Sequence, residues 1–403
     1  MWPIQGSLLL STELIMKELM VKEAQQNLEI QKVLKRIKEL RIKQGVSIGA
    51  LEKRLILGPG WVSEFEDGKT IPGIDIFFAI IQELGLTLGE FKIENLGTVK
   101  PVRELMAEVK GDDLVIKFPY GKHNADFELK SAQLPEFEEI LLVMRNGLSG
   151  LGPSNEQLKA SVVADTFIKA TKLWPHINPS DIWWFVVYRA FLDPFNHPAS
   201  EARLNFAQSW KRTAGWALEK VLVEHYSKDL SKVGVRVYIG DDPTKRTLLA
   251  QVKSISRIEA DKVDVLLTTA HEGKETLFGV VHVKASFAER RTDDVPLSKD
   301  LISAGYFSPM WTMDCKSLPA RYPKNKGELG SVREGAEDRR SAKRKDIEDD
   351  GYFSGCYSYN ANTKETPSTQ KSKANILTLD FSNPRDKFYE DVINARDNFL
   401  KSK

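Results

Sequence analysis

Two short apolar runs in the second half of the chain each carry one charged residue suited to chemistry on a phosphate. Asp264 interrupts the run from Val263 to Leu267, and Lys284 ends the run that begins at Val280. An acid and a lysine on neighbouring strands can hold Mg²⁺ beside a phosphate and orient an attacking water. The alternative is a structural ion pair on an edge strand. Because charged groups inside apolar runs are costly to bury idly, the pattern favours a catalytic pair.

These two residues need a sheet to position them. A long helix is expected from Gln208 to about Tyr226, and a second helix over Pro296–Ala304. Strands are expected at Val235–Ile239, Leu248–Val252, Val263–Thr268, Leu277–Ala285 and Phe307–Cys315. The order helix, antiparallel strands, helix, strand predicts a mixed α/β core.

Length and composition bound the class of protein. The chain has 403 residues, of which 41% are apolar and 28% charged, as in a soluble globular protein of two or three domains. A net charge of +2 excludes a global polycation, so any basic surface must be local. Two cysteines, Cys315 and Cys356, suit a reducing cytoplasm. No apolar run approaches the roughly 18 residues of a membrane span, and no secretory signal is expected.

The expected fold class is multidomain α/β (α+β), with an all-α N-terminal module and a C-terminal mixed sheet. Within the middle region, Asp112–Tyr120 and Ala125–Leu129 are predicted to form a hairpin, followed by an amphipathic helix over Leu134–Leu148. The aromatic residues between Trp174 and Phe195 have helical spacing amid aliphatics, which favours core packing over base stacking. We expect an extension helix over 1–28, a helical module over 29–95, a hairpin and helix over 96–150, a helical region over 151–205 and the mixed-sheet domain over 206–403.

The helical module contains a short helix, a glycine-containing turn and a second short helix. Ser47 caps the first of these helices, and the segment Leu57–Gly60 separates it from the second, which begins at Trp61. The ordered set Arg41, Ser47, Leu51, Val62, Ser63, Glu66, Gly68, Pro72, Ile80, Leu84, Gly85 and Phe91 resembles the Cro/C1 repressor (XRE) helix-turn-helix family.

The resemblance implies that the segment from Gly60 to Glu66 presents a recognition helix to the major groove of DNA. The candidate contacts are Gly60, Trp61, Ser63, Glu64 and Lys69. Trp61, Glu64 and Glu66 depart from the usual chemistry, because direct readout favours Arg, Lys, Asn or Gln. A helical docking or dimerisation module is therefore the alternative interpretation.

In the C-terminal half, residues 206–320 resemble type II restriction endonucleases of the PD-(D/E)xK nuclease superfamily. The likeness is carried by Glu219 on the first helix, by Asp264 and by the tripeptide His282-Val283-Lys284. It implies a nuclease site in which Asp264 and the carbonyl of Val283 hold Mg²⁺ (or Mn²⁺), while Glu219 either completes the metal shell or holds Lys284 by an ion pair. Lys284 would position or deprotonate a water, since its pKa would fall on desolvation.

One departure from the superfamily pattern concerns the second acid, which His282 replaces. Histidine is a poorer ligand for Mg²⁺ than a carboxylate, so Glu219 is the expected substitute. Asp293 and Asp294 precede a predicted helix, and capping is favoured over a metal cluster as their role. Asp314 and Lys316 form a rival acid–lysine pair that leaves its strand too early.

Basic residues outside this site are candidate DNA contacts. Arg290 and Arg291 lie next to the catalytic strand, where arginines can clamp phosphates or bind guanine. The densest positive cluster, which includes Arg340, Lys343 and Arg344, is predicted either to follow a phosphate backbone or to form a solvated helix face. The polar stretch 362–375 is expected to be a flexible loop.

The prediction is a cytoplasmic, Mg²⁺-dependent type II restriction endonuclease that cleaves a specific double-stranded DNA site. A palindromic site calls for a homodimer, and a cognate DNA methyltransferase is the expected genetic partner. The competing interpretation is an XRE-type transcriptional regulator whose degenerate nuclease domain serves dimerisation. A repair or defence nuclease that acts on DNA structure is a third.

Overall fold

The structure is a computed structural model that falls into two compact units, Met1–Pro101 and Val102–Lys403, which we describe separately. It describes residues 34–55, 57–67, 69, 76, 79–80, 83–84, 105–120, 123–149, 151, 155–192, 206–252, 260–286, 291–316, 324–333 and 338–403. The predicted extension helix over 1–28 lies outside these residues. Within the described part, no helix has the length and apolar character needed to cross a membrane.

The first unit is a small helical module with its own core. A helix over 34–43 ends at Gly45, whose φ of 69° favours glycine. Helix α2 (Ile48–Arg54) begins where the Ser47 side chain accepts a hydrogen bond from the Ala50 N–H, as predicted, and α3 (Trp61–Glu66) follows. The buried side chains of these segments form one apolar cluster: Leu34, Ile37, Leu40, Leu51, Val62, Phe65, Ile80 and Leu84.

The second unit begins with an antiparallel sheet of three strands, β1 (Met106–Lys110), β2 (Asp113–Tyr120) and β3 (His123–Leu129). The β2–β3 hairpin confirms the prediction, whereas β1 was not predicted. Helix α5 (Leu134–Leu148) has the predicted bounds and buries the apolar stripe that defined it: Phe137, Ile140, Leu141, Met144 and Leu148.

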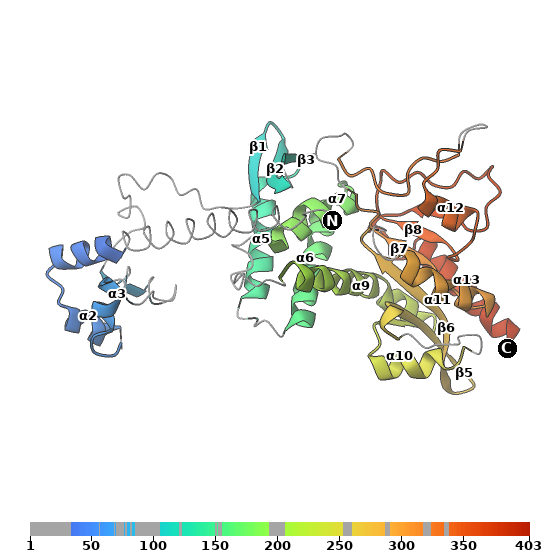
Figure 1. Ribbon diagram of the computed structural model, residues 1–403, viewed down its shortest axis with the longest axis horizontal. Coiled ribbons are helices and arrows are strands. Elements are labelled where there is room, and N and C mark those ends of the chain that lie inside the picture. The colour runs from blue at the N-terminus through green and yellow to red at the C-terminus, as the bar shows by residue number, and fades with distance from the viewer. Residues whose placement is uncertain are drawn as a thin grey trace, which may run out of the picture. The chain divides into compact units, whose positions relative to one another are not determined.

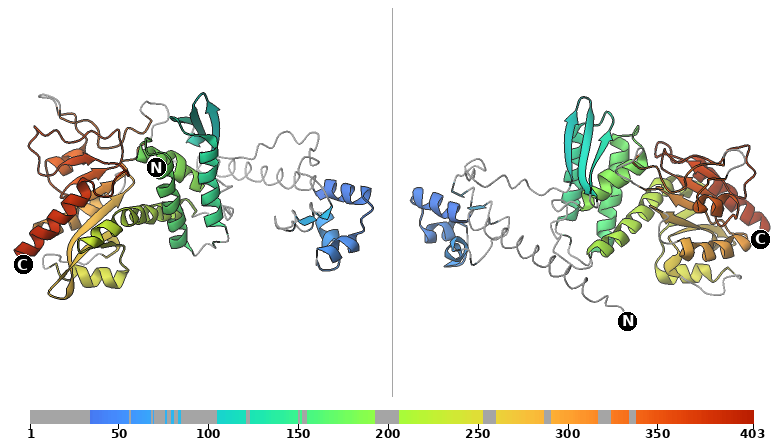
Figure 2. Two further views of the ribbon diagram at one scale, coloured as in Figure 1. Left: turned by 180° about the vertical axis from the view of Figure 1, so that it is seen from behind. Right: turned by 45° about the horizontal axis from the view of Figure 1, so that its top comes forward.

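Helices connect this small sheet to the larger one (Figures 1 and 2). They are α6 (Glu156–Leu173), α7 (Pro179–Asp181), the π-helical η2 (Ile182–Tyr188), α8 (Arg189–Leu192) and α9 (Phe206–Lys232). Core packing is confirmed for four of the aromatic side chains of this stretch, since Trp174, Trp183, Phe185 and Phe191 are at most 2% exposed. Trp184 and Tyr188 are partly buried against the same core, and Phe195 lies outside the described residues. One apolar core runs from Leu105 to Phe399, so the expected domain boundaries at 150 and 205 fall inside it.

The larger sheet has six strands in chain order: β4 (Val235–Tyr238), β5 (Val265–His271), β6 (Lys274–Lys284), β7 (Met310–Thr312), β8 (Cys356–Ser358) and β9 (Ile376–Thr378). Strands β4, β5 and β6 pair antiparallel, whereas β6 to β9 pair parallel. Figure 1 shows α9, α11 (Arg291–Ser303) and α13 (Lys387–Ser402) beside this sheet. The mixed sheet confirms the predicted fold class.

Two predictions about this part of the chain were wrong. Residues Leu248–Val252 are not a strand: helix α10 (Asp242–Leu249), which the Asp241 side chain caps by accepting the Thr244 N–H, includes the first two of them, and the other three follow in a turn. The loop 362–375 is not free, since Thr366 Oγ1 and Gln370 Nε2 donate hydrogen bonds to the buried Glu348 carboxylate at 2.7 and 3.1 Å. Polar composition alone therefore did not indicate whether the loop is anchored.

A close approach between β6 and the segment before β7 generates a first prediction. A Cβ at Gly279 would lie 2.6 Å from the Phe307 carbonyl oxygen, a backbone atom that cannot rotate away. We expect Gly279→Ala to lower the unfolding free energy by about 1–3 kcal/mol, as overpacking does. Thermal denaturation measures the effect. The control is Gly215→Ala on α9, where an added Cβ meets nothing within 4 Å and alanine should raise stability. Equal melting temperatures for the two variants would contradict the close approach.

Candidate active site

The predicted acid and lysine meet where β5 begins and β6 ends. Val265 pairs with Val281 in the antiparallel register, which brings Asp264, one residue before β5, alongside the end of β6. Lys284 Nζ lies 2.7 Å from Asp264 Oδ2, and the same oxygen accepts the Val283 N–H at 2.8 Å. Both charged side chains are 12% exposed. The strand pairing thus fixes the acid by a backbone hydrogen bond and the lysine by an ion pair.

A second carboxylate reaches the same ammonium group from helix α11. Asp294 Oδ2 lies 3.3 Å from Lys284 Nζ, and the Asp294 side chain is 5% exposed. The predicted capping role is therefore wrong for Asp294, which faces the sheet. Helical spacing carried the signal, because Leu297, Ser298 and Leu301 share its face and are also buried.

The His282 side chain lies beside Ser308 and Asp294 and is fully buried. Its Nε2 is 3.0 Å from Ser308 Oγ, and its Nδ1 is 4.0 Å from Asp294 Oδ1. Burial, with a smaller contribution from the charge of Lys284, lowers the pKa of His282 to about 4 against the opposing effect of Asp264. The imidazole is therefore neutral at physiological pH.

The charge state of Lys284 differs from the sequence-based expectation. Burial by itself would lower its pKa, but the charges of Asp264 and Asp294 and the hydrogen bonds to both outweigh burial, so the pKa is raised. The expected fall was therefore wrong for the protein without a metal. Lys284 is therefore a protonated ammonium group in this state. It can attract and orient a negatively charged group, but it cannot act as a base.

The oxygen atoms of this site suit a hard divalent cation. Asp264 and Asp294 bring two carboxylates to Lys284, and the Val283 carbonyl belongs to the same strand end. Mg²⁺ commonly binds one or two carboxylates and keeps several waters. Among the residues that the structure describes, no three His, Cys, Asp or Glu side chains gather closely enough to form a complete metal cage. A Mg²⁺ site here would therefore rest on two carboxylates, a carbonyl and water.

Comparisons with known proteins identify the family. Residues 37–91 match the family described as Helix-turn-helix. The type II restriction enzyme AgeI of Thalassovita gelatinovora is 34% identical over 239 residues, which are 57% of this chain and 82% of AgeI. This chain belongs to the type II restriction endonuclease family.

Solved structures agree with this assignment. The crystal structure of the specific restriction endonuclease AgeI–DNA complex matches with a TM-score of 0.60 and 29% identity, over 70% of this chain and 99% of that one. A pre-specific BsaWI–DNA complex matches with a TM-score of 0.31 and 18% identity, over 66% and 94% of the two chains, too weakly to compare architecture. The resemblance to both families stated from the sequence is confirmed.

In this restriction endonuclease, Glu219 lies buried on α9, the helix that packs against β4 and β6. Its role as the missing carboxylate stays a prediction. The acid that meets Lys284 in the structure is Asp294, so the second carboxylate comes from a helix after the catalytic strand. The alternation of residues along β6 could not have revealed this contact, because Asp294 lies on helix α11, whose residues repeat with a different period.

The rival acid–lysine pair has a structural role. Asp314 is fully buried with φ 42° and accepts N–H groups of Glu328 at 2.6 Å and Leu329 at 3.3 Å, and the Thr363 hydroxyl at 2.7 Å. Lys316 is 53% exposed and pairs loosely with Glu328 at 3.7 Å. Asp314 therefore fixes the loops after β7 and β8, and the preference for Asp264 and Lys284 is consistent with the geometry.

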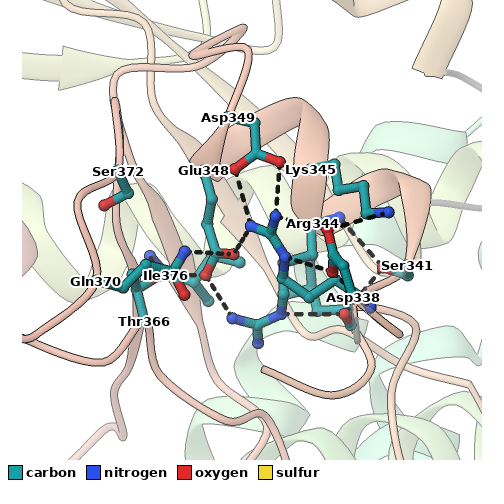
Figure 3. A network of polar contacts seen from close by, with 12 residues as sticks. Asp338, Ser341, Arg344, Lys345, Glu348, Asp349, Thr366, Gln370, Ser372 and Ile376 are labelled. Atoms are coloured by element: carbon teal, nitrogen blue, oxygen red, sulfur yellow. Dashed lines mark hydrogen bonds and ion pairs between the residues drawn. The ribbon is translucent and has the colours of Figure 1, made fainter. Parts of the chain in front are cut away.

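Two arginines of the basic cluster are buried in an ion-pair network around α12 (Ala342–Glu348) (Figure 3). Arg340 Nη1 lies 2.8 Å from Glu348 and its Nη2 2.7 Å from Asp349, and it also binds Asp338. Arg344 lies 2.7 Å from Glu348 and donates to backbone carbonyls of Leu329 and Lys364. The arginine side chains are 2% and 0% exposed. The prediction that Arg340 and Arg344 follow a DNA backbone was therefore wrong.

The remaining predicted DNA contacts are placed as follows. Lys343 pairs with Glu328 and is 22% exposed. Arg290 lies outside the described residues, and Arg291 is the first residue of α11. Helix α3 begins after Gly60, whose φ is 86°. Of the predicted contacts on and after this helix, Glu64 is exposed, Ser63 is half-buried and the Lys69 side chain is 71% exposed.

Two further side chains of the recognition helix pack inward. Trp61 stacks on Phe65 with ring centroids 5.8 Å apart. Glu66 forms a buried pair with Arg41, at 2.5 and 2.8 Å, so it does not belong to the acidic DNA-facing edge predicted for it. The exposed edge of this helix is consequently less acidic than the sequence indicated.

The buried arginine network generates a second prediction. Arg344→Met removes one of the two arginine partners of a fully buried carboxylate and the guanidinium hydrogen bonds to the carbonyls of Leu329 and Lys364, which should lower the unfolding free energy by about 3–5 kcal/mol. Calorimetry measures the stability, and a salt titration of DNA binding should keep its slope. The matched control is Lys345→Met, one residue away and 38% exposed, which should change stability by about 1 kcal/mol or less. Unchanged stability with a reduced salt slope would restore the DNA-contact interpretation.

Proposed function

We propose that this restriction endonuclease hydrolyses phosphodiester bonds of double-stranded DNA at a specific site, with Asp264, Lys284 and Asp294 as the catalytic residues. The observation that carries the proposal is the convergence of two nearly buried carboxylates on one lysine ammonium, at 2.7 and 3.3 Å. A cluster of charged side chains such as this one is costly to bury unless it binds a charged ligand. Family membership supports DNA cleavage as the activity.

Each residue has a role that follows from phosphodiester chemistry. Asp264 and Asp294, with the Val283 carbonyl, would hold Mg²⁺ (or Mn²⁺), which supplies charge stabilisation at the scissile phosphate and lowers the pKa of a water. Lys284, as a compact cation, would orient that water and attract the phosphate. The Val283 N–H keeps Asp264 turned toward this point.

The wider assembly belongs to the proposal as well. AgeI was solved as a DNA complex, which supports duplex DNA as the substrate here. Cleavage of both strands of a palindrome calls for a homodimer. A cognate methyltransferase would protect the host's own sites in the cytoplasm. The regulator with a degenerate nuclease domain is not favoured, because the acid–lysine site is intact.

Isosteric substitutions test the catalytic roles. Asp264→Asn, Asp294→Asn and Lys284→Met should each reduce the single-turnover cleavage rate on the order of a hundredfold to a thousandfold, because each removes a charge from the reacting centre. DNA affinity in a gel-shift assay should change little. Plasmid and phage DNA with Mg²⁺ or Mn²⁺ are the substrates.

The control for Asp294 is Asp300→Asn on the same helix, which should cleave at the wild-type rate. Glu219→Gln distinguishes a metal-shell role from packing: a loss equal to that of Asp294→Asn would support the first. Wild-type cleavage by Asp264→Asn or Asp294→Asn would refute the proposed site.

The helix-turn-helix unit is proposed to contact DNA through the exposed edge of α3, with Gly60, Trp61, Ser63, Glu64 and Lys69 as candidates. If Lys69 binds a phosphate, Lys69→Ala should reduce the slope of log affinity against log salt by about 0.9. Glu64→Gln should raise affinity, because it removes a repelling charge. Fluorescence anisotropy with duplex DNA measures both.

The control is Lys401→Ala, an exposed lysine on α13. Slopes equal to wild type for both lysine variants would favour the docking or dimerisation interpretation of this unit.

A further inference from the structure

Asp294, the third charged residue of the proposed active site, belongs to helix α11, so its position depends on how α11 docks on β6. Asp264 and Lys284 are fixed by strand pairing. Asp294 is not, and its 3.3 Å contact with Lys284 requires that α11 hold one distance from the sheet. A displacement of about 1 Å in such a group is enough to cost a hundredfold in rate. Some contact between helix and strand must therefore set this distance.

His282 makes that contact with both sides of its ring. Nε2 lies 3.0 Å from Ser308 Oγ, and Ser308 Oγ lies 2.7 Å from Ser298 Oγ on α11. Nδ1 lies 4.0 Å from Asp294 Oδ1, also on α11. Because Asp294 and Ser298 are four residues apart, they occupy one face of the helix. The imidazole thus stands between β6 and that face.

The proton on the ring can be assigned from this geometry. A neutral imidazole has one N–H and one acceptor nitrogen. If Ser298 donates to Ser308 Oγ, and the Ser308 hydroxyl donates to Nε2, then the imidazole hydrogen is on Nδ1 and points toward the Asp294 carboxylate. The opposite tautomer would direct a lone pair at a carboxylate. The first arrangement is favoured because it places an N–H beside a negative charge.

Nδ1 has no hydrogen-bond partner among the described residues, although it is fully buried. An unsatisfied buried donor costs about 1–3 kcal/mol and calls for an explanation. Asp294 Oδ1 lies 4.0 Å from Nδ1, beyond hydrogen-bond range. Catalytic hydrogen bonds are often long without substrate and shorten in the complex. A small turn of the Asp294 carboxylate would close this gap.

Resting on the proposed function, we propose that His282 is a positioning residue: its Nδ1–H holds Oδ1 of Asp294, so that Oδ2 faces Lys284 and the metal. His282 is then neither a metal ligand nor a proton carrier. The Ser308–Ser298 pair holds the ring in the tautomer that this role needs. Residues that orient metal ligands in this way typically change metal affinity or activity by about 10–100-fold when removed.

Two amide substitutions separate the two ring nitrogens. An asparagine amide nitrogen occupies the place of Nδ1, whereas a glutamine amide nitrogen occupies the place of Nε2. We expect His282→Asn to keep the cleavage rate within a few-fold of wild type. His282→Gln and His282→Ala should lose about 10–100-fold in kcat, with KM for DNA unchanged. Mn²⁺ affinity, measured by electron paramagnetic resonance on the DNA complex, should fall in parallel.

Structural damage is separated from positioning by the order of the variants. Melting temperatures identify any variant that is merely unstable. In an Asp294→Asn background, His282→Gln should not lower kcat further, because the two substitutions remove the same interaction.

NMR spectra of ¹⁵N-histidine-labelled protein report the tautomer directly. The signals that disappear in His282→Asn identify the His282 ring among the six histidines, and their shifts should be those of the Nδ1–H tautomer.

Three results would overturn the proposal while leaving the active site itself intact. The first is His282→Gln with wild-type kcat and Mn²⁺ affinity, and the second is an Nε2–H tautomer. Loss of metal binding in His282→Asn as severe as in Asp264→Asn would also overturn it, because His282 would then act as a ligand. If Asp264→Asn and Asp294→Asn cleave normally, the failure is that of the proposed function instead.

Discussion

The Lys284 ammonium group lies within ion-pair distance of two carboxylates, and the rest of the proposed active site is built around this contact. Asp264 and Asp294 are both shielded from solvent, at 12% and 5% exposure, so water does little to stabilise their negative charges. Under the proposed function, a divalent cation bound by the same two carboxylates would add positive charge at this point.

Elsewhere in the second unit, buried charge is balanced within the protein. Glu348 is fully buried, but it accepts hydrogen bonds from Arg340, Arg344, Thr366 and Gln370 (Figure 3). Asp314 likewise has its carboxylate oxygens occupied by N–H and hydroxyl donors. Asp264 and Asp294 differ from these residues in that both contact a lysine to which we assign a catalytic role.

Much of the fold follows from local patterns in the sequence. Helix α5 was predicted with its bounds because five apolar residues define a single stripe, and Ser47 was identified as a cap from its place before a helical run. Strands β8 and β9 were not predicted, since each has only three residues. Such short strands have too few residues to show an alternating pattern and depend on their neighbours in the sheet.

The sequence placed Asp264 and Lys284 of the proposed active site together because the two residues share a local strand register. Helical spacing indicates that Asp294 is on the buried face of α11, but it does not indicate that this face docks beside Lys284. The basic cluster was misinterpreted although a local pattern was present: Arg344 and Glu348 are four residues apart on one helix, a spacing that indicates pairing within the protein.

The polar contacts around Asn325 and Asn360 join parts of the chain that lie far apart in sequence. Asn325 donates to Ser180 and Asp181 beside α7, and Asn178 of the same segment donates to Asn360 after β8. The helical layer and the catalytic sheet therefore cannot be inherited as separate modules. A chimaera that exchanged one without the other would break several buried amide contacts at once, so evolution in this family is expected to change both together or neither.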